Sequence, residues 1–120
     1  MRLLPILLIM ALGSASAAPA LLTPQELATA LKHKSFTLIN VHVPFEGAIP
    51  ETDAFIPFDA IKDSAQLPRD HAAQIVLYCR SGSMSAIAHA TLNKLGYSNV
   101  RELQGGFNAW KQAGFPLTQR

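Results

Sequence analysis

The sequence contains a single cysteine, Cys79, among its 120 residues. One cysteine cannot close an internal disulfide, so the fold must be stabilised by packing alone. The histidines are scattered as well, without the Cys-x-x-Cys or His-x-x-x-His spacing that is typical of metal sites. We therefore expect no metal and no organic cofactor, and we predict surface or packing positions for His33, His42, His71 and His89.

The chain also lacks a strong charge of either sign. Its formal net charge is +2, and it has no basic stripe and no patch of interleaved basic and aromatic residues. Proteins that bind nucleic acids usually carry such a patch, so a nucleic-acid partner is not expected.

No apolar run is long enough to cross a bilayer, which takes about 20 residues. The longest run, Leu3–Leu12, follows the charged start Met1-Arg2 and precedes the small residues Ala15-Ser16-Ala17. This order is typical of a secretory signal peptide with an A-x-A cleavage site. We predict a signal peptide at residues 1–17 and export to the periplasm, with an uncleaved membrane anchor as the alternative. Residues 18–120 would then form one domain without a stable membrane anchor.

Four short apolar segments rich in β-formers predict strands. They lie at residues 36–41, 54–58, 75–78 and 100–103. Helix-forming segments separate most of them along the chain. Strands that alternate with helices favour an α/β fold in which helices cover both faces of a parallel sheet.

Capping signals predict where the helices begin and end. Thr23-Pro24-Gln25-Glu26 is a capping box with proline at the first helical position, and a helix should follow it to about Lys32. Asp59 is expected to cap a short helix at 61–67, and a further helix, capped by Ser85, should end at Gly96. A last helix should follow Gly105-Gly106 and carry Phe107 and Trp110 at i, i+3 spacing, with Trp110 in the core.

The most informative stretch leads from the apolar segment Ile75–Tyr78 through Cys79 into a polar loop and a helix. Ligands of open α/β sheets bind at the carboxyl ends of strands, where a helix N-terminus offers unpaired N–H groups and a partial positive charge. Helix N-termini and cations such as Arg80 favour the thiolate form of cysteine, and Gly82 lets loop N–H groups converge on one anion. The pattern predicts a reactive thiolate at Cys79, and the alternative is a small buried core residue.

The predicted strands and helices, in their order along the chain, resemble a single-domain rhodanese-like (sulfurtransferase) protein over essentially all of residues 18–120. Three segments carry this resemblance. Tyr78-Cys79-Arg80-Ser81-Gly82-Ser83 is similar to the active-site loop of that family, and Leu103-Gln104-Gly105-Gly106-Phe107-Asn108-Ala109-Trp110 is similar to its C-terminal signature. Thr23-Pro24-Gln25-Glu26-Leu27 resembles its opening helix. The resemblance implies a three-layer α/β sandwich with a five-stranded parallel sheet. It also implies a thiosulfate sulfurtransferase that moves a sulfane sulfur from a small donor to a thiol or cyanide acceptor, with a protein acceptor left open.

The resemblance suggests roles for the residues of the loop. Cys79 would attack the donor and carry the sulfur as a persulfide, stabilised by converging N–H groups of residues 80 to 84, including Gly82. Arg80 would attract an anionic donor, or remain a solvated charge. Hydrogen bonds to the sulfur are expected from Ser81 and Ser83. Glu46 would gate the mouth of the site, or remain a plain surface carboxylate.

The sequence departs from the family pattern at three places. Asn40-Val41-His42 stands where the family commonly has Asp-Val-Arg, so a charged pair is missing, while Glu46 matches a common acidic position. The segment Gly47–Thr52 replaces the usual Gly-His-Ile-Pro-Gly-Ala run, after a loop that is about three residues shorter. Met84 occupies the sixth loop position, which is often Arg or Thr. We therefore expect weak use of thiosulfate and better use of less charged or more apolar donors.

Two other classes of function remain open. A related loop with Arg six positions after the cysteine makes a phosphatase or an arsenate reductase, because tetrahedral oxyanions need a bidentate guanidinium. Ser85 stands at that position here, which argues against this class. The second alternative is a persulfide carrier or binding module with low turnover. Turnover with thiosulfate and cyanide would distinguish that module from an enzyme.

Overall fold

The computed structural model describes residues 20–119, and the signal peptide predicted at residues 1–17 lies outside them. Within these residues, β1 (Leu21–Leu22), α1 (Pro24–Leu31), β2 (Thr37–Asn40) and β3 (Ala54–Phe55) come first. The 3-10 helix η2 (Phe58–Asp63), β4 (Ile75–Tyr78), α2 (Ser83–Lys94), β5 (Val100–Leu103) and α3 (Gly106–Gln112) follow. No helix in the described range is long and apolar enough to cross a membrane.

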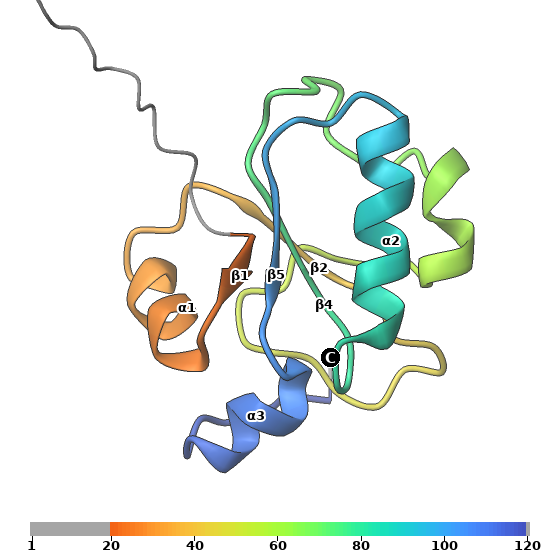
Figure 1. Cartoon of the computed structure of the whole chain (residues 1–120). Coiled ribbons are helices and arrows are strands. Elements are labelled where there is room, and N and C mark those ends of the chain that lie inside the picture. Colours follow the sequence, from red (N-terminus) through yellow and green to blue (C-terminus); the bar gives the residue numbers. More distant parts are fainter. Residues whose placement is uncertain (1–19, 120) are drawn as a thin grey trace, which may run out of the picture.

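The five strands form one parallel sheet in the order β1-β5-β4-β2-β3. β4 lies at its centre, and all four of its residues are buried, as expected for a continuous apolar run covered on both faces. Figure 1 shows α2 on one side of the sheet and α1 on the other. The predicted α/β sandwich with a parallel sheet is therefore confirmed.

Each face of the sheet has its own hydrophobic core. Side chains that alternate along a strand point to opposite faces, so neighbouring residues of β4 contribute to different cores. The core under α2 and η2 includes Ile75, Leu77 and Cys79. The core under α1 and α3 includes Val76, Tyr78, Phe107 and Trp110. Burial of Trp110 was predicted from the sequence and is confirmed, and Phe107 is buried with it.

Most of the predicted elements are present. The capping box at Thr23 forms with both of its hydrogen bonds, and the strand predicted at 100–103 has the bounds Val100–Leu103. The prediction of a cap at Asp59 was wrong: the 3-10 helix begins at Phe58 after Pro57, so Asp59 lies inside its first turn. The strand predicted at 54–58 covers only Ala54–Phe55, because that 3-10 helix begins so early.

β1 was not expected from the sequence. Two residues are too few to show a hydrophobic period, and only their pairing with Glu102 and Leu103 of β5 identifies them as a strand.

Candidate active site

Cys79 directly follows β4, at the centre of the carboxyl edge of the sheet, and only 1% of its surface is exposed. The backbone N–H of Gly82 donates to Cys79 Sγ at 3.0 Å, and the N–H of Ser85 donates at 3.4 Å. Gly82 is the N-cap of α2 and has a φ of 128°, which a residue with a Cβ rarely adopts. The chain therefore curls around the sulfur and brings the first turn of α2 to it.

Ser85 lies in that first turn and is fully buried. The prediction that Ser85 caps α2 was wrong, because the helix begins two residues earlier, at Ser83, and Gly82 occupies the cap position. The Ser85 hydroxyl instead lies 3.7 Å from Cys79 Sγ, with the thiol as donor. It is also within donating distance of the Gly82 carbonyl, at 3.1 Å, and of Glu102 Oε1, at 2.9 Å.

The sulfur thus has contacts that differ from those expected for the loop. N–H groups of residues 80 to 84 were predicted to converge on it, and within this range the structure gives the hydrogen bond from Gly82. The side chains of Ser81 and Ser83, predicted as donors, are exposed. Ser85, further along the chain, donates its N–H to the sulfur, and its hydroxyl oxygen accepts from the thiol.

The N-terminus of α3 holds the other side of the loop. Phe107 N–H donates to the Cys79 carbonyl at 2.9 Å, and Asn108 N–H donates to the Arg80 carbonyl at 3.0 Å. A Cβ on Gly106 would lie only 2.3 Å from the Arg80 carbonyl oxygen. Glycine is therefore required at position 106 for α3 to approach the loop this closely.

A small hollow opens above the sulfur, with a volume of about 50 Å³. Its lining consists of Cys79, the loop residues Arg80, Ser81, Ser83 and Met84, and His42 from the loop after β2. A larger hollow of about 470 Å³ lies at the amino ends of the strands, but its lining includes neither cysteine nor histidine. The smaller hollow is therefore the better candidate for chemistry.

Glu46 lies beside the mouth of this hollow, between two basic side chains. Its Oε1 is 3.3 Å from Arg80 Nη1 and 3.3 Å from His42 Nε2. The His42 ring is buried, and its Nε2 lacks the geometry of a hydrogen bond. The Arg80 side chain is 53% exposed, so it can turn toward an incoming anion. Arg80 thus makes an ion pair with the loop after β2, although the Asp-x-Arg pair of the family pattern is missing there.

Buried polar contacts attach the loop after β2 to the sheet. The Asn40 amide donates to the Gly47 carbonyl at 3.0 Å and accepts from His42 N–H at 2.9 Å. The Tyr78 hydroxyl accepts from Ile49 N–H at 3.0 Å and lies 2.8 Å from Thr52 Oγ1. Burial raises the pKa of Tyr78 above its usual value of 10, and these two hydrogen bonds reduce the increase.

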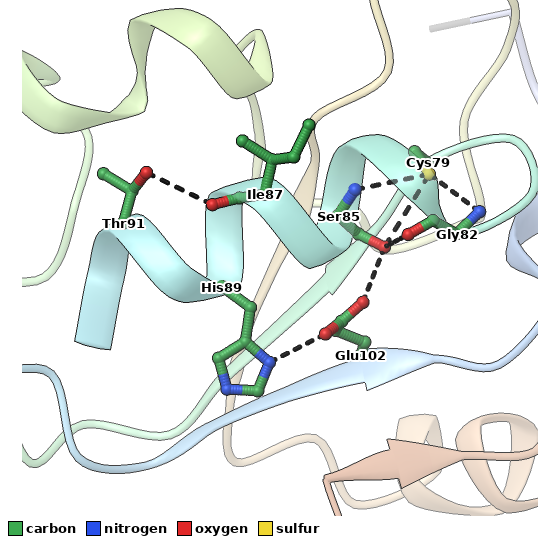
Figure 2. A network of polar contacts seen from close by, with 7 residues as sticks. All are labelled: Cys79, Gly82, Ser85, Ile87, His89, Thr91 and Glu102. Atoms are coloured by element: carbon green, nitrogen blue, oxygen red, sulfur yellow. Dashed lines mark hydrogen bonds and ion pairs between the residues drawn. The ribbon is translucent and has the colours of Figure 1, made fainter. Parts of the chain in front are cut away.

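Sequence reasoning missed two residues behind the sulfur, Glu102 in β5 and His89 in α2. His89 Nδ1 lies 2.8 Å from Glu102 Oε2, and Figure 2 shows the chain of contacts from this pair through Ser85 to Cys79. Glu102 pairs with Leu77 of β4, so its side chain shares a face of the sheet with Cys79. The only signal in the sequence was the spacing of four residues between Ser85 and His89, which places them on one helix face.

Comparisons with known proteins agree with this architecture. The rhodanese-like domain family matches residues 23–113. A rhodanese-related protein of known structure from Thermoplasma volcanium is 27% identical, with a TM-score of 0.69, and the match covers 82% of this chain and 97% of that chain.

Three curated relatives are similar in sequence. The sulfurtransferase of Allochromatium vinosum is 36% identical over 67% of this chain and 76% of its own length. The probable adenylyltransferase/sulfurtransferase MoeZ of Mycobacterium tuberculosis is 40% identical over 74% of this chain. The uncharacterized Synechocystis protein slr1261 is 33% identical over 82% of this chain. The match spans only 24% of the length of MoeZ and 55% of slr1261.

Proposed function

This chain belongs to the rhodanese-like domain family, and we propose that the protein carries a sulfane sulfur as a persulfide on Cys79. Its relatives that are named sulfurtransferases support sulfur transfer in general. The donor is a small molecule such as thiosulfate, and the acceptor is a thiol or cyanide. A protein acceptor is a further candidate, because the relative MoeZ combines sulfurtransferase with adenylyltransferase in its name.

The proposed reaction has two displacement steps. In the first, the Cys79 thiolate attacks the outer sulfur of thiosulfate, the sulfur–sulfur bond of the donor breaks, and sulfite leaves with the electron pair. Cys79 then carries an anionic persulfide. In the second step, cyanide or a thiolate attacks the outer sulfur, the bond to Cys79 breaks, and the electron pair returns to the Cys79 thiolate. Thiocyanate or an acceptor persulfide is released.

One observation carries this proposal: a buried cysteine sulfur receives two backbone N–H groups and faces a small hollow. Preorganised N–H donors stabilise negative charge on sulfur as they do on oxygen, without reorganisation during the reaction. Arg80 at the rim supplies a cation that an anionic donor can approach. A core cysteine without a chemical role has no need for this arrangement.

Intact mass spectrometry tests the proposal. Incubation of the purified protein with thiosulfate or a polysulfide should add one sulfur atom, which a thiol reductant removes. Cys79→Ser is a clean blank because the chain has no other cysteine, and it should show no adduct. An adduct that persists in Cys79→Ser would contradict the role of Cys79.

Steady-state turnover distinguishes an enzyme from a persulfide carrier. Thiosulfate and cyanide should produce thiocyanate with many turnovers per Cys79. Stoichiometric loading without turnover would instead support the low-turnover carrier or binding module.

A further inference from the structure

The arrangement of Ser85, Glu102 and His89 behind the sulfur has no part in the two displacement steps, yet all three side chains are largely buried. Ser85 is fully buried, and the side chains of His89 and Glu102 are 16% and 12% exposed. A buried ion pair costs desolvation energy and is weak evidence for a role in stability alone. Its contact with a residue that touches the sulfur therefore calls for another explanation.

The Ser85 hydroxyl has one proton and three neighbours that could accept it. Glu102 Oε1, at 2.9 Å, is closer than the Gly82 carbonyl, at 3.1 Å, or Cys79 Sγ, at 3.7 Å. An ionised Glu102 draws this proton away from the sulfur, because hydrogen bonds to charged acceptors are the stronger ones. The contact between Cys79 and the Ser85 hydroxyl then requires a thiol as its donor. With its proton on Glu102, this hydroxyl therefore suits the protonated cysteine.

A thiolate or persulfide at Cys79 has no proton to donate to the Ser85 hydroxyl. The sulfur then needs the Ser85 proton, and Glu102 would lose one donor while its negative charge remains close to the sulfur. Like charges at short range disfavour each other in a partly buried site. Protonated His89, at 2.8 Å from Glu102 Oε2, removes this conflict by cancelling the carboxylate charge.

We propose that the His89–Glu102 pair controls how readily Cys79 carries negative charge. Glu102 alone opposes the thiolate and the persulfide, and protonated His89 offsets this effect through the pair. Both are positioning residues, which act on the sulfur through the Ser85 hydrogen bond and through the charge of Glu102. The inference rests on the proposed function for its biological meaning, but the charge on Cys79 can be measured without any sulfur donor.

Other charged groups lie on the elements around this pair. The elements packed on α2 carry Asp59, Lys62 and Asp63 in η2 and Arg101 and Glu102 in β5, while β4 carries none. Of these residues, Glu102 contacts His89, at 2.8 Å between Glu102 Oε2 and His89 Nδ1. Arg80 and His42 line the hollow at Cys79, and Glu46 contacts both of them. Their influence on Cys79 stays the same when only position 89 or 102 is changed, so they do not produce a difference between those variants.

The test is the rate of alkylation of Cys79 by iodoacetamide, which reacts with the thiolate, measured across pH in the full chain. His89→Asn keeps an N–H group near the position of Nδ1 but cannot carry a charge. It should slow alkylation at pH 7 by about three- to tenfold and move the midpoint of the profile to higher pH. Glu102→Gln removes the opposing charge, so it should speed alkylation and move the midpoint to lower pH. The double variant should behave like Glu102→Gln.

The distinguishing result is that the alkylation profile shifts in opposite directions in His89→Asn and Glu102→Gln. A purely structural role would shift the profile of both variants in the same direction. Shifts of the same sign, or no shift in either variant, would overturn the proposal. His33→Asn, at an exposed histidine outside the network, is the matched control and should leave the profile unchanged. Circular dichroism checks the fold of each variant.

A replacement variant and a second measurement complete the test. If His89→Asn does not fold, His89→Gln replaces it, and slower alkylation in Glu102→Gln alone is sufficient to contradict the proposal. Sulfur loading measured by mass in the same variants separates the two proposals. Opposite alkylation shifts without any sulfur adduct would reject the persulfide function only, and an adduct without those shifts would reject the role of the pair only.

Discussion

Met84 lines the hollow above the Cys79 sulfur, at the loop position where the family often has Arg or Thr. It is partly buried and packs against the core under α2. Its thioether is polarizable and apolar, so it offers no charge to an anionic donor. At the scale of single residues, position 84 is therefore the best candidate for the choice of sulfur donor.

Met84→Arg should raise kcat/KM for thiosulfate. A hydrogen bond to a charged group contributes roughly 1.5–3 kcal/mol, and about 1.4 kcal/mol in the transition state is tenfold in rate. The gain should decrease as salt is added, because a partly exposed charge is screened. Steady-state kinetics with thiosulfate and with a less charged organic thiosulfonate would measure the change in preference.

Met84→Gln is the matched control for that comparison, since it has a similar length and no charge. Thiosulfate activity in Met84→Arg that stays at or below the wild-type level, with the fold intact by circular dichroism, would mean that position 84 does not select the donor.

Among the elements, α3 has the clearest effect on the site. Its first N–H groups donate to the carbonyls of Cys79 and Arg80, so the helix holds the loop from the side opposite to α2. This contact depends on Gly106, which has a φ of 62° and lies against the loop backbone. The position of the sulfur is therefore determined by two helices and not by its own loop alone.

Gly106→Ala should destabilise the protein by more than about 2 kcal/mol and reduce sulfur loading at Cys79. A Cβ there would lie 2.3 Å from the Arg80 carbonyl oxygen and 2.4 Å from the Cys79 carbonyl oxygen, and backbone atoms cannot move aside as a flexible side chain can. Gly114→Ala is the control: Gly114 also has a positive φ, of 92°, but a Cβ there would meet nothing within 4 Å. Equal losses of stability in both variants, by urea denaturation, would argue against the steric explanation.

Tyr78 connects β4 to the loop that carries Glu46 toward the site. Tyr78→Phe leaves the buried Ile49 N–H without its acceptor, which should cost about 1–3 kcal/mol of unfolding free energy at neutral pH. The folded-state pKa of Tyr78 lies above 10, so below pH 10 the tyrosine is neutral in both states and its contribution is fully present. As pH rises above 10, ionisation of the unfolded chain reduces that contribution.

The stability difference between wild type and Tyr78→Phe should therefore decrease as pH rises above 10. Urea denaturation of both proteins at several alkaline pH values measures it. A difference that stays constant or grows would contradict a raised pKa at Tyr78.

At the scale of the whole molecule, the parallel sheet assembles the site. All strands point the same way, so the loops after β2, β4 and β5 meet at one edge of the sheet. They bring Glu46, Cys79 and Gly106 together, although these residues are far apart in the sequence. The two hydrophobic cores hold the sheet between its helices without a disulfide.

We propose that this domain works in the periplasm after removal of residues 1–17. Expression of the full chain in a Gram-negative host should yield a soluble periplasmic protein that begins at Ala18, because a short apolar run followed by small residues directs export and cleavage. N-terminal sequencing of the periplasmic fraction measures this. Recovery of an intact Met1 in the membrane fraction would support an uncleaved anchor instead.

The sequence by itself determined the features that depend on neighbouring residues. The capping box at Thr23, the apolar strand before Cys79 and the last helix with its buried Trp110 follow from local hydrogen bonds and hydrophobic patterns. The position of Cys79 between a central strand and a helix follows for the same reason.

Only the tertiary structure decided what surrounds the sulfur. α2 begins at Ser83, two residues before Ser85, and this shift turns Ser85 from an expected cap into a buried contact of Cys79. Glu102 reaches the same place because β5 pairs with β4 in a register that sets it opposite Leu77. Helix starts and strand registers depend on packing between distant segments, and local sequence patterns carry little information about such contacts.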